Sequence, residues 1–177
     1  MMIMSMLLAM AAPVADMPAS GLTRLPFVPV HSTMRIELDG RGEVASCKTE
    51  AQGAVPPDFT DGACEAFQEF GILSLLLGAD RNRTSAASIV LDMGPAPVAA
   101  TKAVATGTRL AAMTADYAVA ADGTLVGCTV TSRQGAAMSM LDLCEMAFSS
   151  GQQFENGSGD RRGTISFAVY GEMRPGG

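Results

Sequence analysis

The side chains of this chain most able to do chemistry are four cysteines and one histidine. The cysteines are Cys47, Cys64, Cys128 and Cys144, and the histidine is His31. The cysteines lack the CxxC spacing of redox and zinc sites, and a single histidine does not complete a Cys/His metal centre. We therefore expect no metal and no cofactor. The thiols are expected to form disulfides or to lie buried as free cysteines.

No catalytic constellation accompanies these residues in the sequence. An enzyme needs a nucleophile with a base, or paired carboxylates. His31 lies at the start of a predicted strand, between Val30 and Ser32. A single histidine in that setting is far more often structural or solvated than a general base. We therefore interpret the protein as non-enzymatic, with a small secreted enzyme as the least favoured alternative.

The composition excludes two classes of protein. Of 177 residues, 48% are hydrophobic and 5% are aromatic, which excludes a disordered chain and predicts modest cores. The formal net charge is −6, and the Lys and Arg residues form no block. A basic surface for nucleic acid is therefore absent, and we expect no nucleic-acid partner.

The N-terminal segment has the composition of a signal peptide. Residues 1–8 are almost wholly apolar, and the small residues that follow resemble a cleavage site, although no Lys or Arg precedes Arg24. The apolar run is too short to span a bilayer as a helix. The alternative interpretation is a buried N-terminal helix. We expect residues 1–15 to be a signal peptide, the protein to be exported, and the mature chain to have no integral membrane span.

Two stretches of the chain repeat one order of elements. Strands are predicted by alternating apolar residues at 30–38, 43–50 and 88–93, and again at 117–121, 125–132 and 164–170. A helix beginning at Asp58 carries Cys64, and a helix beginning at Ser139 carries Cys144. The pattern predicts an α+β protein of two tandem units, each a three-stranded antiparallel sheet packed with one helix (β-β-α-β).

These elements set the expected domain boundaries. Residues 16–29 form a proline-containing lead-in, and residues 30–94 form the first unit. Residues 95–112, rich in Pro, Ala, Thr and Gly, are the linker, and residues 113–173 form the second unit.

Each unit places one cysteine on its second strand and one on its helix. Four cysteines allow three connectivities. A helix packed on a hairpin brings such positions within the Cα separation that a disulfide needs, and the spacing repeats. We predict the bonds Cys47–Cys64 and Cys128–Cys144, each contributing on the order of 3 kcal/mol. Two buried free thiols per unit remain the alternative.

The second unit resembles the C-terminal domain of TonB, the periplasmic end of the bacterial energy transducer. The resemblance rests on Asp122-Gly123, on residues 125–135 around Cys128, and on Leu141-Asp142-Leu143-Cys144. The first unit fits less well, through Leu38-Asp39-Gly40, residues 44–49 and Cys64. A transducer's membrane anchor and long Pro-rich spacer are missing from this sequence, so we do not expect energy transduction.

The resemblance implies a periplasmic module that adds a partner's extended segment to the exposed edge of its third strand. That edge is Ile165, Ser166, Phe167, Ala168 and Val169. Residues 89–93 form a second edge of this kind. The implied partners are segments of envelope or outer-membrane proteins, and a dimer is also allowed. Two alternatives stay open: the edges pair with each other or are solvated, and the protein is a structural envelope protein without a specific ligand.

Overall fold

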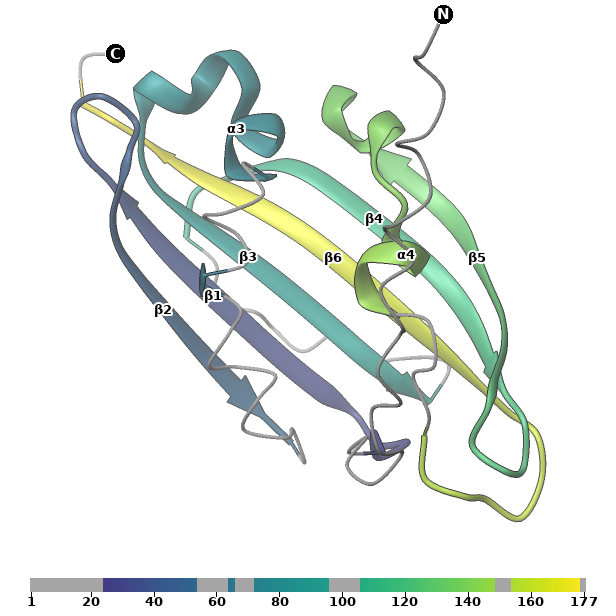
Figure 1. The fold of residues 1–177 in the computed structure, drawn as a ribbon. Helices are drawn as coiled ribbons and strands as arrows, with labels where there is room; N and C mark the ends of the chain where they lie inside the picture. Colours follow the sequence, from purple (N-terminus) through teal and green to yellow (C-terminus); the bar gives the residue numbers. More distant parts are fainter. Residues whose placement is uncertain (1–23, 54–63, 66–71, 96–105, 149–153, 176–177) are drawn as a thin grey trace, which may run out of the picture.

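The computed structural model describes residues 24–53, 64–65, 72–95, 106–148 and 154–175. Within them, six antiparallel strands form one sheet with the order β2-β1-β3-β6-β4-β5 (Figure 1). The strands are β1 (Val30–Leu38), β2 (Val44–Gln52), β3 (Thr84–Pro95), β4 (Thr108–Val119), β5 (Leu125–Gln134) and β6 (Arg161–Met173). β4 begins inside the stretch that was predicted to be a linker.

The prediction of two tandem β-β-α-β units is wrong. The third strand of each predicted unit, β3 and β6, pair with each other from Ala86↔Glu172 to Pro95↔Gly163. All the strands therefore belong to one sheet, whose strand order is symmetric about this pair. An unpaired third strand would leave a row of backbone groups at an apolar edge, and mutual pairing satisfies both rows.

Short helical segments cover one face of the sheet (Figure 1). They are α3 (Ile72–Leu77), the 3-10 segments η1 (Gly78–Arg83) and η2 (Ala136–Met140), and α4 (Leu143–Ala147). Most of the helix predicted from Asp58 lies outside the described residues, of which Cys64 and Glu65 are helical.

The helix predicted to begin at Ser139 begins later. Ser139 lies in η2, and Asp142 is the residue that caps α4. Its Oδ1 accepts hydrogen bonds from the N–H of Cys144 at 2.8 Å and of Glu145 at 3.3 Å. A carboxylate at this position satisfies N–H groups that the helix itself leaves unpaired.

The two faces of the sheet differ in composition. The first face, against which the helical segments pack, presents large apolar residues that include Ile36, Ile89, Met113, Ile165 and Phe167. The second face presents mainly small and polar residues that include Thr33, Asp92, Thr114, Ser166 and Ala168. The core therefore lies between the first face and the helical layer, where α3 contributes Leu73, Leu76 and Leu77.

Four aromatic rings close the core near α4. They belong to Phe27, Tyr117, Phe148 and Phe154, and the ring centroids of five of their six pairs lie 5.1 to 6.0 Å apart. The stretch predicted as a lead-in is thereby part of the fold where it is described, because Phe27 packs on the core and Leu25 forms a parallel bridge with Phe154.

The hairpins β1–β2 and β4–β5 have the same turn. In the second, Ala120 N–H donates to Thr124 O at 2.9 Å and Gly123 N–H donates to Ala120 O at 3.0 Å. Gly123 has φ of 87°, which favours glycine. The first hairpin repeats both bonds with Asp39, Glu43 and Gly42, the last with φ of 76°.

None of the helices in the described part of the chain has the length and apolarity that a membrane crossing requires. Residues 1–15, predicted to be a signal peptide, lie outside the described residues.

Candidate functional site

Two disulfides tie the outer strands of the sheet to the helical layer. Cys47 on β2 is bonded to Cys64, and Cys128 on β5 is bonded to Cys144 in α4. Their Cα atoms lie 6.0 and 5.8 Å apart, within the usual range. The predicted connectivity is confirmed. Each edge of the sheet is therefore held covalently against its own helical segment.

Residues Ile165 to Val169 were predicted as a partner-binding edge, and they are not an edge. Their strand, β6, pairs with β3 on one side and with β4 on the other. The second predicted edge, at 89–93, lies between β1 and β6. The two stretches pair with each other, for example Ile89 with Val169 and Leu91 with Phe167. This is the alternative in which the two predicted edges pair with each other. Strand β6 therefore has no open side for a partner.

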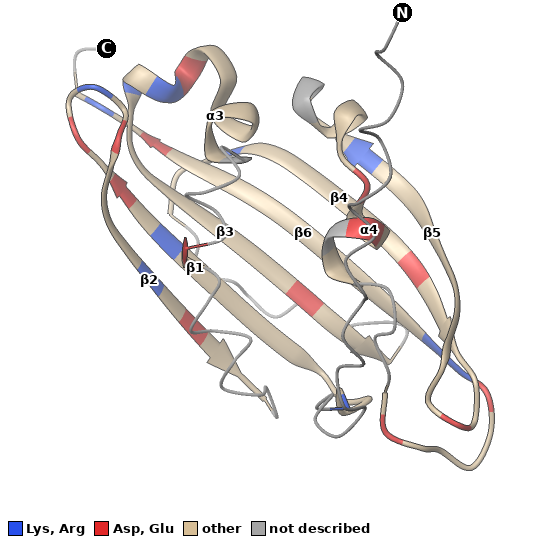
Figure 2. Ribbon diagram, viewed as in Figure 1, with Lys and Arg blue, Asp and Glu red and all other residues tan. Residues whose placement is uncertain are grey.

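The outer strands of the sheet are β2 and β5, and they differ in charge (Figure 2). β2 carries Lys48 and Glu50, both exposed. β5 carries no charged residue from Leu125 to Ser132, and its one charge is Arg133, close to the end of the strand. Charged side chains on an edge strand discourage pairing with another chain. β5 is therefore the edge with less protection of this kind.

The turn geometry shows which backbone groups of β5 point outward. Hydrogen-bonded and non-hydrogen-bonded pairs alternate along an antiparallel ladder. The Ala120–Thr124 pair at the turn is hydrogen-bonded. Ala115 lies five residues before Ala120 on β4, an odd number, so its pair with Val130 is of the non-hydrogen-bonded kind. The N–H and C=O of Val130 therefore point away from β4, toward the open side of the sheet. The same count along β1, starting from the Asp39–Glu43 pair, shows that the N–H and C=O of Thr49 on β2 also point away from the sheet.

Several residues of β5 are exposed to solvent. Val126 is 63% exposed, and a Cβ built on Gly127 would have no other heavy atom within 4 Å. The side chains of Leu125, Cys128 and Val130 are half-buried on the first face. In the part of the chain that the structure describes, no strand pairs with the outer side of β5. This outer side is the candidate functional site.

The strand register also brings His31 beside Asp92 on the second face. His31 Nδ1 lies 2.7 Å from Asp92 Oδ1, and His31 Nε2 lies 3.2 Å from Thr33 Oγ1. The sequence alone does not indicate this cluster, because Asp92 is 61 residues away from His31 and only the pairing of β1 with β3 brings them together.

The order hydroxyl, imidazole, carboxylate is that of an activated nucleophile. The backbone of Thr33, however, lies in the ladder between Glu50 on β2 and Val90 on β3. The described backbone at this point therefore offers no free N–H groups to hold an oxyanion. The cluster satisfies the polar groups of a mostly buried histidine, whose side chain is 14% exposed.

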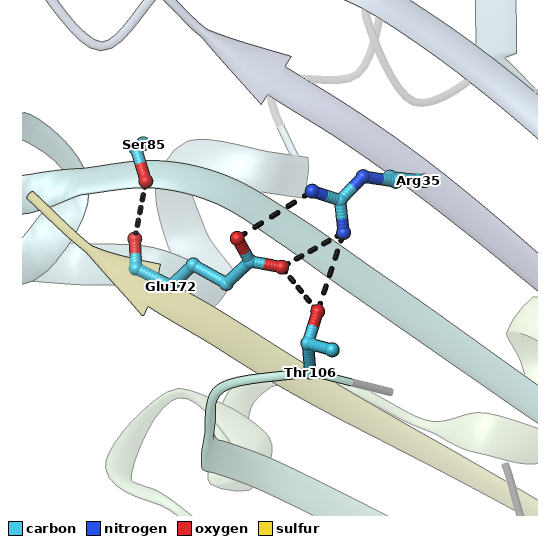
Figure 3. Close-up of polar contacts among 4 residues, drawn as sticks. All are labelled: Arg35, Ser85, Thr106 and Glu172. Carbon is cyan, nitrogen blue, oxygen red and sulfur yellow. Dashed lines mark hydrogen bonds and ion pairs between the residues drawn. The ribbon is translucent and has the colours of Figure 1, made fainter. Parts of the chain in front are cut away.

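A second polar cluster bridges three strands of the sheet (Figure 3). Arg35 on β1 reaches over β3 to Glu172 on β6, with Nη1–Oε1 at 2.8 Å and Nη2–Oε2 at 3.4 Å. Thr106 donates a hydrogen bond to the same carboxylate, and Ser85 Oγ donates to Glu172 O at 3.0 Å. The hydrogen bond from Arg35, followed by that from Thr106, lowers the pKa of Glu172. We interpret this cluster as structural.

No family model, curated protein or solved structure matches this chain. Within the described residues, no group of three or more His, Cys, Asp and Glu side chains is placed to hold a metal ion. The functional assignment therefore depends on the geometry of the sheet edge.

Proposed function

We propose that this protein is an exported, non-enzymatic interaction module that binds an extended segment of another envelope protein by strand addition along β5. The observation that carries the proposal is β5 itself: an outer strand with backbone groups turned outward and no charge from Leu125 to Ser132. An edge of this kind is a ready template for pairing with a further strand.

The disulfides support an exported protein. Disulfides persist in oxidising compartments such as the bacterial periplasm and are rare in the cytosol. The signal-like composition of residues 1–15 and the resemblance of the second stretch to the C-terminal domain of TonB favour the same compartment. We therefore propose a periplasmic location.

A proline tests the proposal directly. Val130→Pro removes the outward N–H, and proline is tolerated on an edge strand where its nitrogen faces solvent. Two matched controls accompany it. Val130→Ala shortens the side chain and keeps the N–H, and Thr49→Pro makes the equivalent change on β2.

The measurement is photo-cross-linking in the native cells from a residue placed at Thr129, which is exposed on β5. Cross-links to an envelope protein are expected in the parent and in both controls, and to be lost with Val130→Pro. Unchanged cross-linking in Val130→Pro would contradict the proposal. Complete absence of cross-links would favour a structural envelope protein, and cross-links only to a second copy would favour a dimer.

A further inference from the structure

The residues of β5 that face outward also define the side chains that an added strand would meet. β4 already pairs with β5 through a set of first-face residues spaced two apart. These pairs are Met113↔Arg133, Ala115↔Val130, Tyr117↔Cys128 and Val119↔Leu125. On β4 these residues are spaced regularly, two apart. On β5 they are not, because each of the two bulges in the ladder adds one residue to β5. A strand added on the other side, in the same direction as β4, would meet the same four residues at positions i, i+2, i+4 and i+6.

Arg133 is the charged member of that set. It is exposed, and no ion pair joins it to another described residue. By the same count along β4, the N–H and C=O of Arg133 also point away from β4, as those of Val130 do. A residue directly opposite it on an added strand would have its Cβ about 5 Å away and on the same face. A carboxylate there would complement an isolated cation.

The other three members are apolar or sulfur-containing. Leu125, Cys128 and Val130 are half-buried, and apolar side chains opposite them would complete their burial. The second face of β5 offers Gly127 and Thr129, which are exposed and small. Residues between the apolar positions are therefore expected to be small or polar.

We infer that the segment bound along β5 has the pattern acidic-x-apolar-x-apolar-x-apolar, with its Asp or Glu opposite Arg133. This inference rests on the proposed function and names the chemistry of the partner. The chain is acidic overall, with a net charge of −6, so its overall charge does not by itself favour an acidic partner. A second copy of β5 does not satisfy the pattern, because the strand holds no Asp or Glu.

The test uses the full-length protein and two labelled peptides, Glu-Thr-Val-Thr-Val-Thr-Val and the same peptide with Lys in place of Glu. Fluorescence anisotropy is expected to give the Glu peptide about two- to five-fold higher affinity, a range typical of an exposed ion pair. Arg133→Glu is expected to reverse the preference, and Arg133→Gln to remove it. Val130→Pro is expected to abolish binding of both peptides.

The outcomes separate the two proposals. Binding that Val130→Pro abolishes, with no preference between the peptides, overturns the inference and leaves strand addition in place. Binding that survives Val130→Pro, or no binding of either peptide, overturns both. A monomer–dimer equilibrium that Val130→Pro disrupts without peptide would give the edge to a second copy and overturn the inference.

Discussion

The ring of Tyr117 on β4 lies over Gly163, its register partner on β6. A Cβ at position 163 would overlap Tyr117 Cζ and lie 2.5 Å from its Oη. The same ring packs against Phe148 at 5.1 Å and Phe154 at 5.6 Å between centroids. The missing side chain at Gly163 thus lets the aromatic cluster rest directly on the sheet.

Gly163→Ala is expected to destabilise the fold. The added methyl group overlaps the Tyr117 ring, and overpacking a well-packed core costs about 1–3 kcal/mol. Urea unfolding measures the change. In a Tyr117→Leu background the same substitution is expected to cost less, because the ring that it meets is gone. An equal cost in both backgrounds would show that another contact is responsible.

Tyr117 is expected to resist ionisation while the protein is folded. Burial raises the pKa of its phenol far above the ordinary value of 10.0. Absorbance of tyrosinate should therefore not differ between the parent and Tyr117→Phe at about pH 11, and should differ once urea unfolds both. Because the folded pKa is the higher one, stability is full below the unfolded pKa and falls as the pH rises above it. The parent should lose more stability than Tyr117→Phe in that range.

The Arg35–Glu172 pair is expected to make a small, pH-dependent contribution to stability. The hydrogen bond from Arg35 lowers the pKa of Glu172 below its ordinary value of 4.5, so the contribution is present above that pH. It is lost as the pH falls through the lowered pKa. The side chains are 44% and 31% exposed, which limits the effect to under about 1 kcal/mol.

Glu172→Gln tests this linkage. The difference in free energy of unfolding between parent and variant should shrink on going from neutral pH to about pH 3, and should also shrink at high salt. A difference that is the same at both pH values would assign the cost of the substitution to something other than the charge.

The two disulfides are expected to contribute similarly to stability and differently to binding. They close loops with sequence separations of 17 and 16, so replacing either pair by serine should cost about 2–4 kcal/mol. Only the pair Cys128 and Cys144 fixes β5, the proposed binding edge. Its removal should weaken peptide binding, whereas removal of Cys47 and Cys64 should leave binding intact. Binding assays at a temperature where both variants stay folded would decide this.

Local features of the fold could be predicted from the sequence, whereas the arrangement of its two halves could not. The alternation of Met34, Ile36 and Leu38 predicts a strand with one buried face, and the repeated cysteine spacing predicts the observed disulfides. The same alternation describes a central strand as well as an edge strand whenever one face is polar. The sequence of residues 165–169 therefore fits either position, and only their non-local pairing with β3 places them in the centre of the sheet.

The two hairpin turns show a second limit of prediction from sequence patterns. The sequence aligns Asp39-Gly40 with Asp122-Gly123 because both are Asp-Gly. The structure gives the positive φ to Gly42 and Gly123, so the equivalent pairs are Arg41-Gly42 and Asp122-Gly123. The distance to the following cysteine carries the signal, since Cys47 and Cys128 both lie five residues after that glycine.

Residue-resolved hydrogen exchange of the Val130 amide, with and without the Glu-Thr-Val-Thr-Val-Thr-Val peptide, tests strand addition at β5 most directly. Its N–H points away from β4, so it should exchange quickly in the free protein and become protected when the peptide binds. The Thr49 amide, its equivalent on β2, should not change. A Val130 amide that is already protected without peptide, or protection that appears at Thr49 instead, would contradict β5 as the binding edge.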